Sequence, residues 1–294
     1  MQRKTRFIAA ALPAVLLLAG CSNGVLDPAG PVGRDDAQIL IDSTLIMLAI
    51  VIPTILLAFW MAWKYRASND KAQYLPNWSY SGRIEAVVWA IPTLTIMLIG
   101  GVIWIGSFRL DPFRPLASKT PAVDVEVVSL DWKWLFVYPD LKIASVNELA
   151  FPAGTPVHFR LTSGSVMNAF FVPQLGTMIY TMAGMETQLS LSSEHMGTFD
   201  GISSNFSGEG FSDMKFFARS MSDDDFQSWV EHARAGGAVL SSAVYHNLEK
   251  PSEKVPVAYY GDIDPMVFHE ALGMMAMSSA SAAPAAAASV EKGL

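Results

Sequence analysis

The chain has 294 residues, of which 51% are hydrophobic and 16% are charged, and the apolar residues are clustered along the sequence. A net charge of −7, with no cluster of lysine and arginine, excludes a surface that binds nucleic acid. The single cysteine, Cys21, excludes an internal disulfide and any metal site built from several thiolates.

Residues 1–20 have the pattern of an export signal. Arg3, Lys4 and Arg6 precede an apolar stretch, residues 7–19, that is too short to span a bilayer. The stretch ends in Leu18-Ala19-Gly20-Cys21, which resembles the processing box of bacterial lipoproteins. This resemblance implies cleavage before Cys21 and attachment of diacylglycerol and a fatty acid such as palmitate, which would anchor the chain in the membrane. The alternative is an ordinary signal peptide with a chance cysteine.

Two longer apolar segments follow. Thr44 to Trp63 carries no charge and would span ~30 Å as a helix, which is the thickness of the hydrocarbon layer. Ala86 to Phe108 is a second uncharged run of similar reach. We therefore expect a transmembrane hairpin over residues 41–108, with helices at about 41–63 and 86–108. A pair of buried core helices is the competing interpretation, and it fits this unbroken apolarity poorly.

The charges beside these segments predict their orientation. The loop at residues 64–85 contains Lys64, Arg66, Lys71 and Arg83, whereas residues 21–40 carry Arg34 alone against three aspartates. The excess of positive charge places the loop in the cytoplasm and both flanks outside. A lipid on Cys21 would also lie outside. We expect a multi-pass protein of the bacterial inner membrane with a large periplasmic domain.

Residues 118–245 show the short alternating runs of a β domain. Val123, Val125 and Val127 share one face of a strand, and a period-two pattern continues through Leu130, Trp132, Trp134 and Phe136. Further predicted strands lie at residues 157–161, 189–191 and 215–219. Turn signals such as residues 152–154 and 208–210 separate them, so the spacing favours an antiparallel sandwich or barrel.

Helical patterns follow the strands. Ser222 is a good N-cap, residues 226–233 carry an apolar stripe, and Gly236 ends the predicted helix. A short helix is expected at residues 265–277, within a C-terminal extension at 246–277. The tail at 278–294, rich in alanine and serine, has too little apolar surface to order.

No catalytic or metal-binding motif is evident in this sequence. The five histidines show no paired ligand spacing, no nucleophile turn of the type G-x-S-x-G occurs between a strand and a helix, and no glycine-rich loop leads into G-K-[ST]. His269 and the methionines around it, such as Met266 and Met274, offer soft ligands for Cu(I). A helix that packs methionines against the domain is the more common arrangement.

The order of these parts resembles subunit II of the haem–copper oxidases, which carries a cupredoxin-like domain. The similarity includes Asp131-Trp132-Lys133-Trp134, the segment at 166–176, and the segment at 197–214, which aligns without gaps on a copper loop of the form C-S-E-x-C-G-x-x-H-x-x-M. It also includes the segments at 63–69 and 85–89. The implied fold class is membrane-anchored α + β: a two-helix transmembrane hairpin, then an all-β cupredoxin-like sandwich and short C-terminal helices.

On this alignment the ligands of a binuclear copper centre are replaced. Asn168 stands at the first histidine, Ser203 and Ser207 at the two cysteines, Asn205 at the glutamate and Phe211 at the second histidine, while Met214 is kept. Hydroxyl and phenyl groups are poor substitutes for thiolate and imidazole at a soft metal. We therefore expect no metal or other cofactor in this chain, and a hydrogen-bonded remnant formed by Asn168, Ser203 and Ser207.

The loss of copper favours quinol over cytochrome c as the electron donor. The chain up to about Tyr260 resembles subunit II of quinol oxidases of the cytochrome bo type. The resemblance implies a non-catalytic subunit of a proton-translocating complex that oxidises quinol and reduces oxygen to water. Haems, the active-site copper and the quinol contacts would belong to subunit I, with further small membrane subunits as partners. Glu85 matches a glutamate near the mouth of a proton-uptake channel, although a helix-start carboxylate explains it equally well.

Two other functions stay open from the sequence. One is a cytochrome c oxidase subunit II with a working copper centre, which the replaced ligands oppose. The other is an envelope lipoprotein that binds or scaffolds something outside respiration, which leaves the copper-loop pattern unexplained. The haem types, the quinone and the role of the tail do not follow from the sequence.

Overall fold

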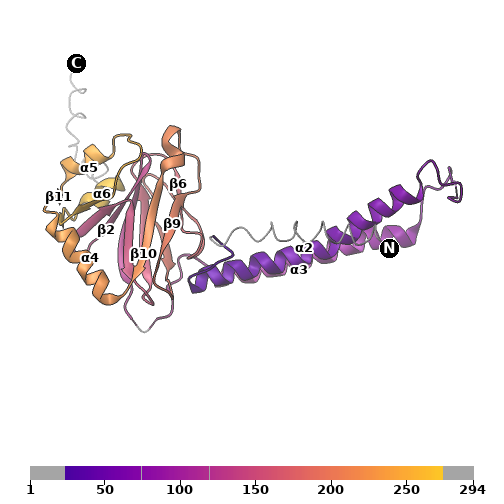
Figure 1. Cartoon of the computed structure of the whole chain (residues 1–294), viewed down its shortest axis with the longest axis horizontal. Helices are drawn as coiled ribbons and strands as arrows, with labels where there is room; N and C mark the ends of the chain where they lie inside the picture. The colour runs from indigo at the N-terminus through magenta and orange to yellow at the C-terminus, as the bar shows by residue number, and fades with distance from the viewer. Residues whose placement is uncertain (1–23, 74, 119, 274–294) are drawn as a thin grey trace, which may run out of the picture. The chain divides into compact units, whose positions relative to one another are not determined.

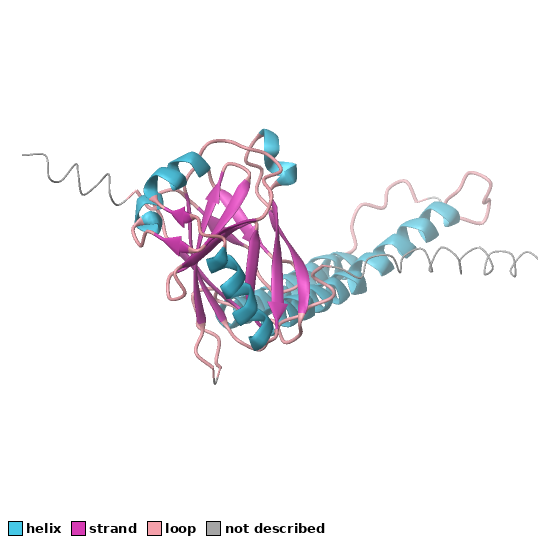
Figure 2. Cartoon of the chain, turned by 60° about the vertical axis from the view of Figure 1, so that its left-hand side comes forward, coloured by secondary structure: helices cyan, strands magenta, loops and turns pink. Residues whose placement is uncertain are grey.

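The computed structural model describes residues 24–273, apart from Tyr74 and Lys119. Cys21, the predicted signal peptide and the predicted C-terminal tail lie outside the described residues. Within them the chain forms two compact units, a helical hairpin at Asp35–Asp111 and a β domain made of the residues before 35 and after 111. Figures 1 and 2 show the long helices and the strand-rich domain, which are considered separately below.

The hairpin consists of α2 (Pro31–Lys64) and α3 (Gly82–Arg109). Both helices are long and apolar enough to cross a membrane, and the side chains of their most apolar stretches are exposed in the isolated chain. Pro53 lies inside α2 and Pro92 inside α3. Membrane helices tolerate such prolines when neighbouring groups satisfy the freed carbonyls.

The structure starts α2 at Pro31, ten residues before the predicted start at about residue 41. Proline is favoured at the first position of a helix because its missing N–H needs no partner there. At 34 residues, α2 is about 51 Å long. The helix is therefore longer than the hydrocarbon layer, and charged residues such as Asp35 and Asp42 occupy its first turns.

Two sheets form a β sandwich. The first sheet has the strand order β12-β3-β2-β1-β5-β8, the second β4-β10-β9-β6-β7, and a small pair joins β11 to β13. The strands are β1 (Val123–Leu130), β2 (Lys133–Tyr138), β3 (Ile143–Val146), β4 (Glu148–Pro152), β5 (Val157–Ser163), β6 (Asn168–Phe171), β7 (Ile179–Thr181), β8 (Thr187–Leu191), β9 (Gly197–Ser203), β10 (Lys215–Met221), β11 (Val239–Leu240), β12 (Ala258–Tyr260) and β13 (Asp262–Ile263).

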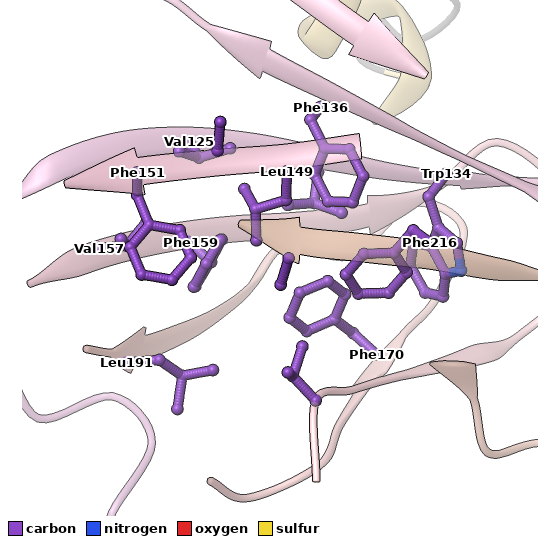
Figure 3. Close-up of a cluster of buried hydrophobic side chains, with 14 of the residues drawn as sticks. Val125, Trp134, Phe136, Leu149, Phe151, Val157, Phe159, Phe170, Leu191 and Phe216 are labelled. Carbon is purple, nitrogen blue, oxygen red and sulfur yellow. The ribbon is translucent and has the colours of Figure 1, made fainter. Parts of the chain in front are cut away.

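The main core lies between the two sheets and is rich in aromatic rings (Figure 3). Phe170 from β6 stacks on Phe216 from β10, with ring centroids 5.1 Å apart and an interplanar angle of 16°. Trp134 from β2 meets both rings edge-on. The predicted strand pattern therefore points the correct residues, Trp134 and Phe136, into the interior.

The period-two pattern fails at Trp132, which lies in a two-residue turn between β1 and β2. Leu130 pairs directly with Lys133, and Trp132 has a φ of 63°. The chain reverses here, so the run from Leu130 to Phe136 is a hairpin rather than one continuous strand.

A second core covers the outer face of the first sheet. Alternate residues of β1 and β2, among them Val128 and Leu135, pack against the C-terminal helices. Those helices are α5 (Ser242–Leu248) and α6 (Val267–Ala271), the second of which is shorter than the helix predicted at 265–277. β2 is thus buried on both faces along its whole length, which explains its run of apolar residues, and β1 is buried from Val125 to Leu130.

The helix α4 (Asp223–Ala235) begins after Ser222, whose side chain accepts a hydrogen bond from Asp225 N, and ends at Gly236 as predicted. Its Trp229 donates through Nε1 to Glu148 Oε1 at 2.8 Å. Tyr259 on β12 donates to the same oxygen at 2.6 Å, and burial, as the largest cause, raises the pKa of Tyr259 to about 12. One buried carboxylate therefore joins α4, β4 and β12.

Residues 27–34, here called the docking segment, lie against the β domain. Ala29 N donates to Gln174 O at 2.8 Å, and Ala29 O accepts from Glu194 N at 2.8 Å. Arg34 forms an ion pair with Glu194. The segment is held by backbone hydrogen bonds on two loops, so the first turn of α2 belongs to the β domain.

Candidate functional site

The residues predicted to replace copper ligands gather at one end of the sandwich. This loop end comprises the turn at 131–132, the loop at 164–167 and the segment at 204–214, which includes the short 3-10 helix η1 (Glu209–Asp213). The opposite end is defined by the register of Val123, Val157 and Leu191 across three strands. The docking segment contacts that opposite end, at Ser192 and Glu194.

Asn168 and Ser203 form a buried pair. Ser203 lies at the end of β9 and donates through Oγ to Asn168 Oδ1 at 3.1 Å. The amide nitrogen of Asn168 donates to Val166 O at 3.1 Å, and Ser203 is also 3.3 Å from Asn205 O. These groups satisfy one another, so this part of the predicted hydrogen-bonded remnant is present.

Ser207 does not join this pair, which corrects the predicted three-residue remnant. Within the described part of the chain, its buried Oγ has no hydrogen-bond partner. Its carbonyl oxygen instead accepts from Trp132 Nε1 at 3.1 Å. The backbone turns sharply at Gly208, which has a φ of 113°, and a Cβ on Gly210 would lie 2.5 Å from the Trp132 ring. The Trp132 indole therefore packs on the loop and binds the Ser207 carbonyl, whereas the Ser207 hydroxyl takes no part.

The other aligned positions serve local packing. Phe211 meets Phe206 edge-on with centroids 5.6 Å apart. Met214 is 1% exposed and belongs to the main core, and its carbonyl accepts from Ser203 N. Asn205 donates through its side chain to Met167 O at 3.0 Å. Their roles as former ligand positions stay predictions.

The donor set does not suit a binuclear copper centre. The aligned side chains are two serine hydroxyls, two amides, a phenyl ring and the thioether of Met214, whereas a binuclear copper centre requires thiolate and imidazole as well. Among residues 24–273, with 74 and 119 left out, no three His, Cys, Asp or Glu side chains form a metal-binding group. The chemistry of these side chains, rather than that count, argues against copper here.

Lys133 is a buried cation that the sequence analysis did not single out. It is 1% exposed, and its Nζ donates to Asp131 O and Lys250 O, each at 3.0 Å. Burial lowers the pKa of this ammonium group, with Asp131 acting in the opposite direction. Both acceptors are backbone carbonyls, so Lys133 ties the turn at 131–132 to the C-terminal segment.

Glu85 lies in the first turn of α3, and its backbone N donates to Ser81 O at 3.0 Å. Its side chain is exposed. This geometry agrees with a helix-start carboxylate, and a role in proton uptake stays a prediction.

Comparisons with known proteins match this arrangement. A family model described as "Cytochrome C oxidase subunit II, periplasmic domain" matches residues 139–221, and one described as "COX Aromatic Rich Motif" matches residues 234–278. The second match covers the segment that packs on the outer core.

Relatives of known name extend the match over most of the chain. Cytochrome bo(3) ubiquinol oxidase subunit 2 of Pseudomonas aeruginosa is 51% identical over 87% of this chain and 78% of its own length. Ubiquinol oxidase subunit 2 of Acetobacter aceti is 48% identical over 88% of this chain and 84% of its own. The crystal structure of the periplasmic domain of subunit II of cytochrome oxidase of Bradyrhizobium japonicum aligns with a TM-score of 0.38 and 24% identity, over 40% of this chain and 98% of that one.

The fold is that of an oxidase subunit II: two apolar helices followed by a cupredoxin-like periplasmic domain with short C-terminal helices. Among oxidase subunits II, the relatives that match most of this chain at 48–51% identity are subunits of ubiquinol oxidases. The chain belongs to the ubiquinol oxidase subunit 2 family.

Proposed function

We propose that the chain is the second subunit of a proton-translocating quinol oxidase and carries no binuclear copper centre. In the reaction of the complex, two quinols give four electrons that reduce one O2 to two water molecules. Haems, copper and quinol contacts reside in subunit I, and further small membrane subunits complete the assembly. This chain contributes its hairpin and its β domain.

The composition of the loop end is the observation that carries the proposal. Ser203 and Asn168 satisfy each other at 3.1 Å, and Trp132 closes the loop beside Ser207. A soluble electron donor would need a redox centre in this domain to pass its electrons inward. Quinol dissolves in the membrane and can reduce a haem in subunit I directly, so a domain without copper suits a quinol donor.

Metal and haem analysis of the complex purified through a tag on this chain tests the proposal. We expect haem, copper in the amount of one active site, no near-infrared band of a binuclear copper centre, and oxygen uptake with quinol but not with reduced cytochrome c. A near-infrared copper band, turnover with cytochrome c, or purification without any haem-containing partner would each overturn it.

We further propose that Cys21 carries the lipid anchor on the outer face of the inner membrane. The support is the processing box at residues 18–21 and its agreement with the charge-based orientation of the hairpin. Mass spectrometry of the mature N-terminus should find a lipid-modified Cys21, and an unmodified terminus would contradict the anchor.

Glu85 is proposed to lead protons toward the partner subunit. Its exposed carboxylate at the start of α3 can exchange protons with the aqueous phase. Glu85→Ala should slow proton-coupled turnover while the haem content stays normal, whereas Asp70→Ala, in the same loop, should have no effect. Equal turnover in the Glu85 variant and the unchanged complex would remove this role.

A further inference from the structure

A cavity of about 750 Å³ lies at the loop side of the hairpin, where α2 ends and α3 begins. Its wall includes apolar side chains from the helix ends and the loop, together with aromatic and cationic groups. The lining includes Met61, Tyr65, Arg66, Leu75, Trp78 and Ile84. This loop joins the two spans, and the excess of positive charge in it places it on the cytoplasmic side.

Arg66 is held in place with its charge uncompensated. Its Nε donates to Ser68 Oγ at 3.0 Å, and its guanidinium lies over the Trp63 ring, 5.3 Å from the centroid. No carboxylate among the described residues forms an ion pair with it. One edge and one face of the guanidinium are thus occupied, and the two terminal nitrogens are left to donate in parallel, which is the geometry that matches a phosphate.

The turn that carries Arg66 is fixed by Asn69. The Asn69 side chain donates to Lys64 O at 2.5 Å and accepts from Lys71 N at 3.2 Å, and its backbone N donates to Arg66 O at 2.9 Å. A ligand that binds Arg66 therefore meets a preorganised turn, and less ordering entropy is lost on binding.

The surroundings favour an anionic ligand at a membrane surface. Residues 64–85 contain four cations, Lys64, Arg66, Lys71 and Arg83, against the two carboxylates of Asp70 and Glu85. The aromatic rings of Trp78 and Tyr65 are exposed at this level, and such rings settle at the headgroup region. Basic pockets on the cytoplasmic side attract the anionic lipids of that leaflet.

We propose that this cavity binds one anionic phospholipid. The Arg66 guanidinium takes the headgroup phosphate in a two-pronged contact, Trp78 and Tyr65 flank the glycerol region, and an acyl chain follows Met61, Leu75 and Ile84. The site lies outside the β domain and is independent of the proposed electron donor.

The test uses the intact complex reconstituted in nanodiscs of phosphatidylcholine with a minor share of phosphatidylglycerol, followed by native mass spectrometry of the lipids retained. We expect one phosphatidylglycerol retained in preference to phosphatidylcholine. Arg66→Gln should lower that retention about fivefold, the effect of one cation at a membrane surface. Arg66→Lys should give an intermediate loss, because it keeps the charge and loses the fork.

Arg83→Gln is the matched control, since it removes the same charge from the same loop at a residue that does not line the cavity. An equal loss in Arg83→Gln and Arg66→Gln would mean that only the loop charge matters, and would overturn the site. Unchanged retention in Arg66→Gln would mean that protein covers the cavity in the complex, which also overturns it. Displacement of the lipid by millimolar inorganic phosphate would show a free-anion site instead.

Discussion

Single side chains decide whether the loop end can hold copper. Ser203 donates a hydrogen bond to Asn168, and Phe211 packs on Phe206, so each of these side chains has a local role that does not involve a metal. The sequence analysis predicts a hydrogen bond among Asn168, Ser203 and Ser207, and the structure has one between Ser203 and Asn168. The predicted contact of Ser207 is wrong, because the Trp132 indole donates a hydrogen bond to the Ser207 carbonyl. The position of this indole depends on the positive φ of Trp132 in the turn between β1 and β2, which the sequence pattern does not show.

Gly201 on β9 lies against the Phe216 ring, where there is no room for a larger side chain. A Cβ at Gly201 would lie 2.1 Å from the Phe216 ring, which is fixed by its stacking on Phe170. Gly201→Ala should lower the free energy of unfolding by roughly 1–3 kcal/mol through overpacking. Thermal unfolding of the purified chain in detergent measures the change.

Gly197 lies in the same strand and provides the control. A Cβ there would sit 3.4 Å from the Phe199 ring, an ordinary contact distance that a small movement accommodates. Gly197→Ala should leave the unfolding temperature nearly unchanged. If both substitutions changed the unfolding temperature equally, the change would come from the lost backbone freedom of glycine in the unfolded chain and not from a clash with the Phe216 ring.

Elements of this protein are stabilised by what covers them. The strand β2 is apolar on both faces because α5 and α6 cover the outer side of its sheet, where Leu135 and Val137 pack. The two C-terminal helices are too short to be stable alone, so contacts must hold them in place. Besides apolar packing, a charged cluster joins them. His246 on α5 lies 2.8 Å from Glu249 through Nδ1 and 2.8 Å from Glu270 of α6 through Nε2.

The contact between α5 and α6 should depend on pH. Two ring nitrogens that face carboxylate oxygens are both donors only in the charged imidazolium. The hydrogen bond to Glu249 is the largest cause that raises the pKa of His246 above 6.5, and Glu270 adds to it. Stabilisation by this group is therefore complete below pH 6.5 and is lost as the pH rises through the raised pKa.

Hydrogen exchange of α5 and α6 peptides across this pH range, corrected for the intrinsic rate, measures that dependence. Protection should fall as the pH rises, and His246→Gln should abolish the fall. His195→Gln, at an exposed histidine in another loop, should keep it. A pH dependence that survives in His246→Gln would assign the effect to other groups.

At the scale of the whole molecule, the docking segment and the start of β1 lie at the same end of the β domain. Val123, which begins β1, pairs with Val157, and Val157 pairs with Leu191 beside the docking segment. The loop end begins at the turn at 131–132, which follows the other end of β1, and Ser203 and Asn168 lie there on β9 and β6 of the second sheet. Within the β domain, the docking segment is therefore separated from the predicted copper positions.

The docking segment provides a test at this scale. A Cβ on Gly30 would lie 2.0 Å from Ser192 O, a backbone atom that cannot move aside easily. Gly30→Ala should detach the segment and remove hydrogen-exchange protection at Ala29 and Glu194. Leu26→Ala, at a side chain that is 67% exposed, is the control and should leave protection intact. Retained protection in Gly30→Ala would contradict this role.

The sequence alone determined the parts that depend on local pattern. Apolar runs of sufficient length predict the two long helices. Ser222 and Gly236 mark the start and the end of α4, and the period of two predicts that Trp134 points into the core. Only the tertiary structure decided the turn at Trp132, the burial of Lys133 and the cover of the first sheet by α5 and α6. These features depend on contacts between residues far apart in the chain, such as Lys133 with Lys250, and local sequence patterns do not record such contacts.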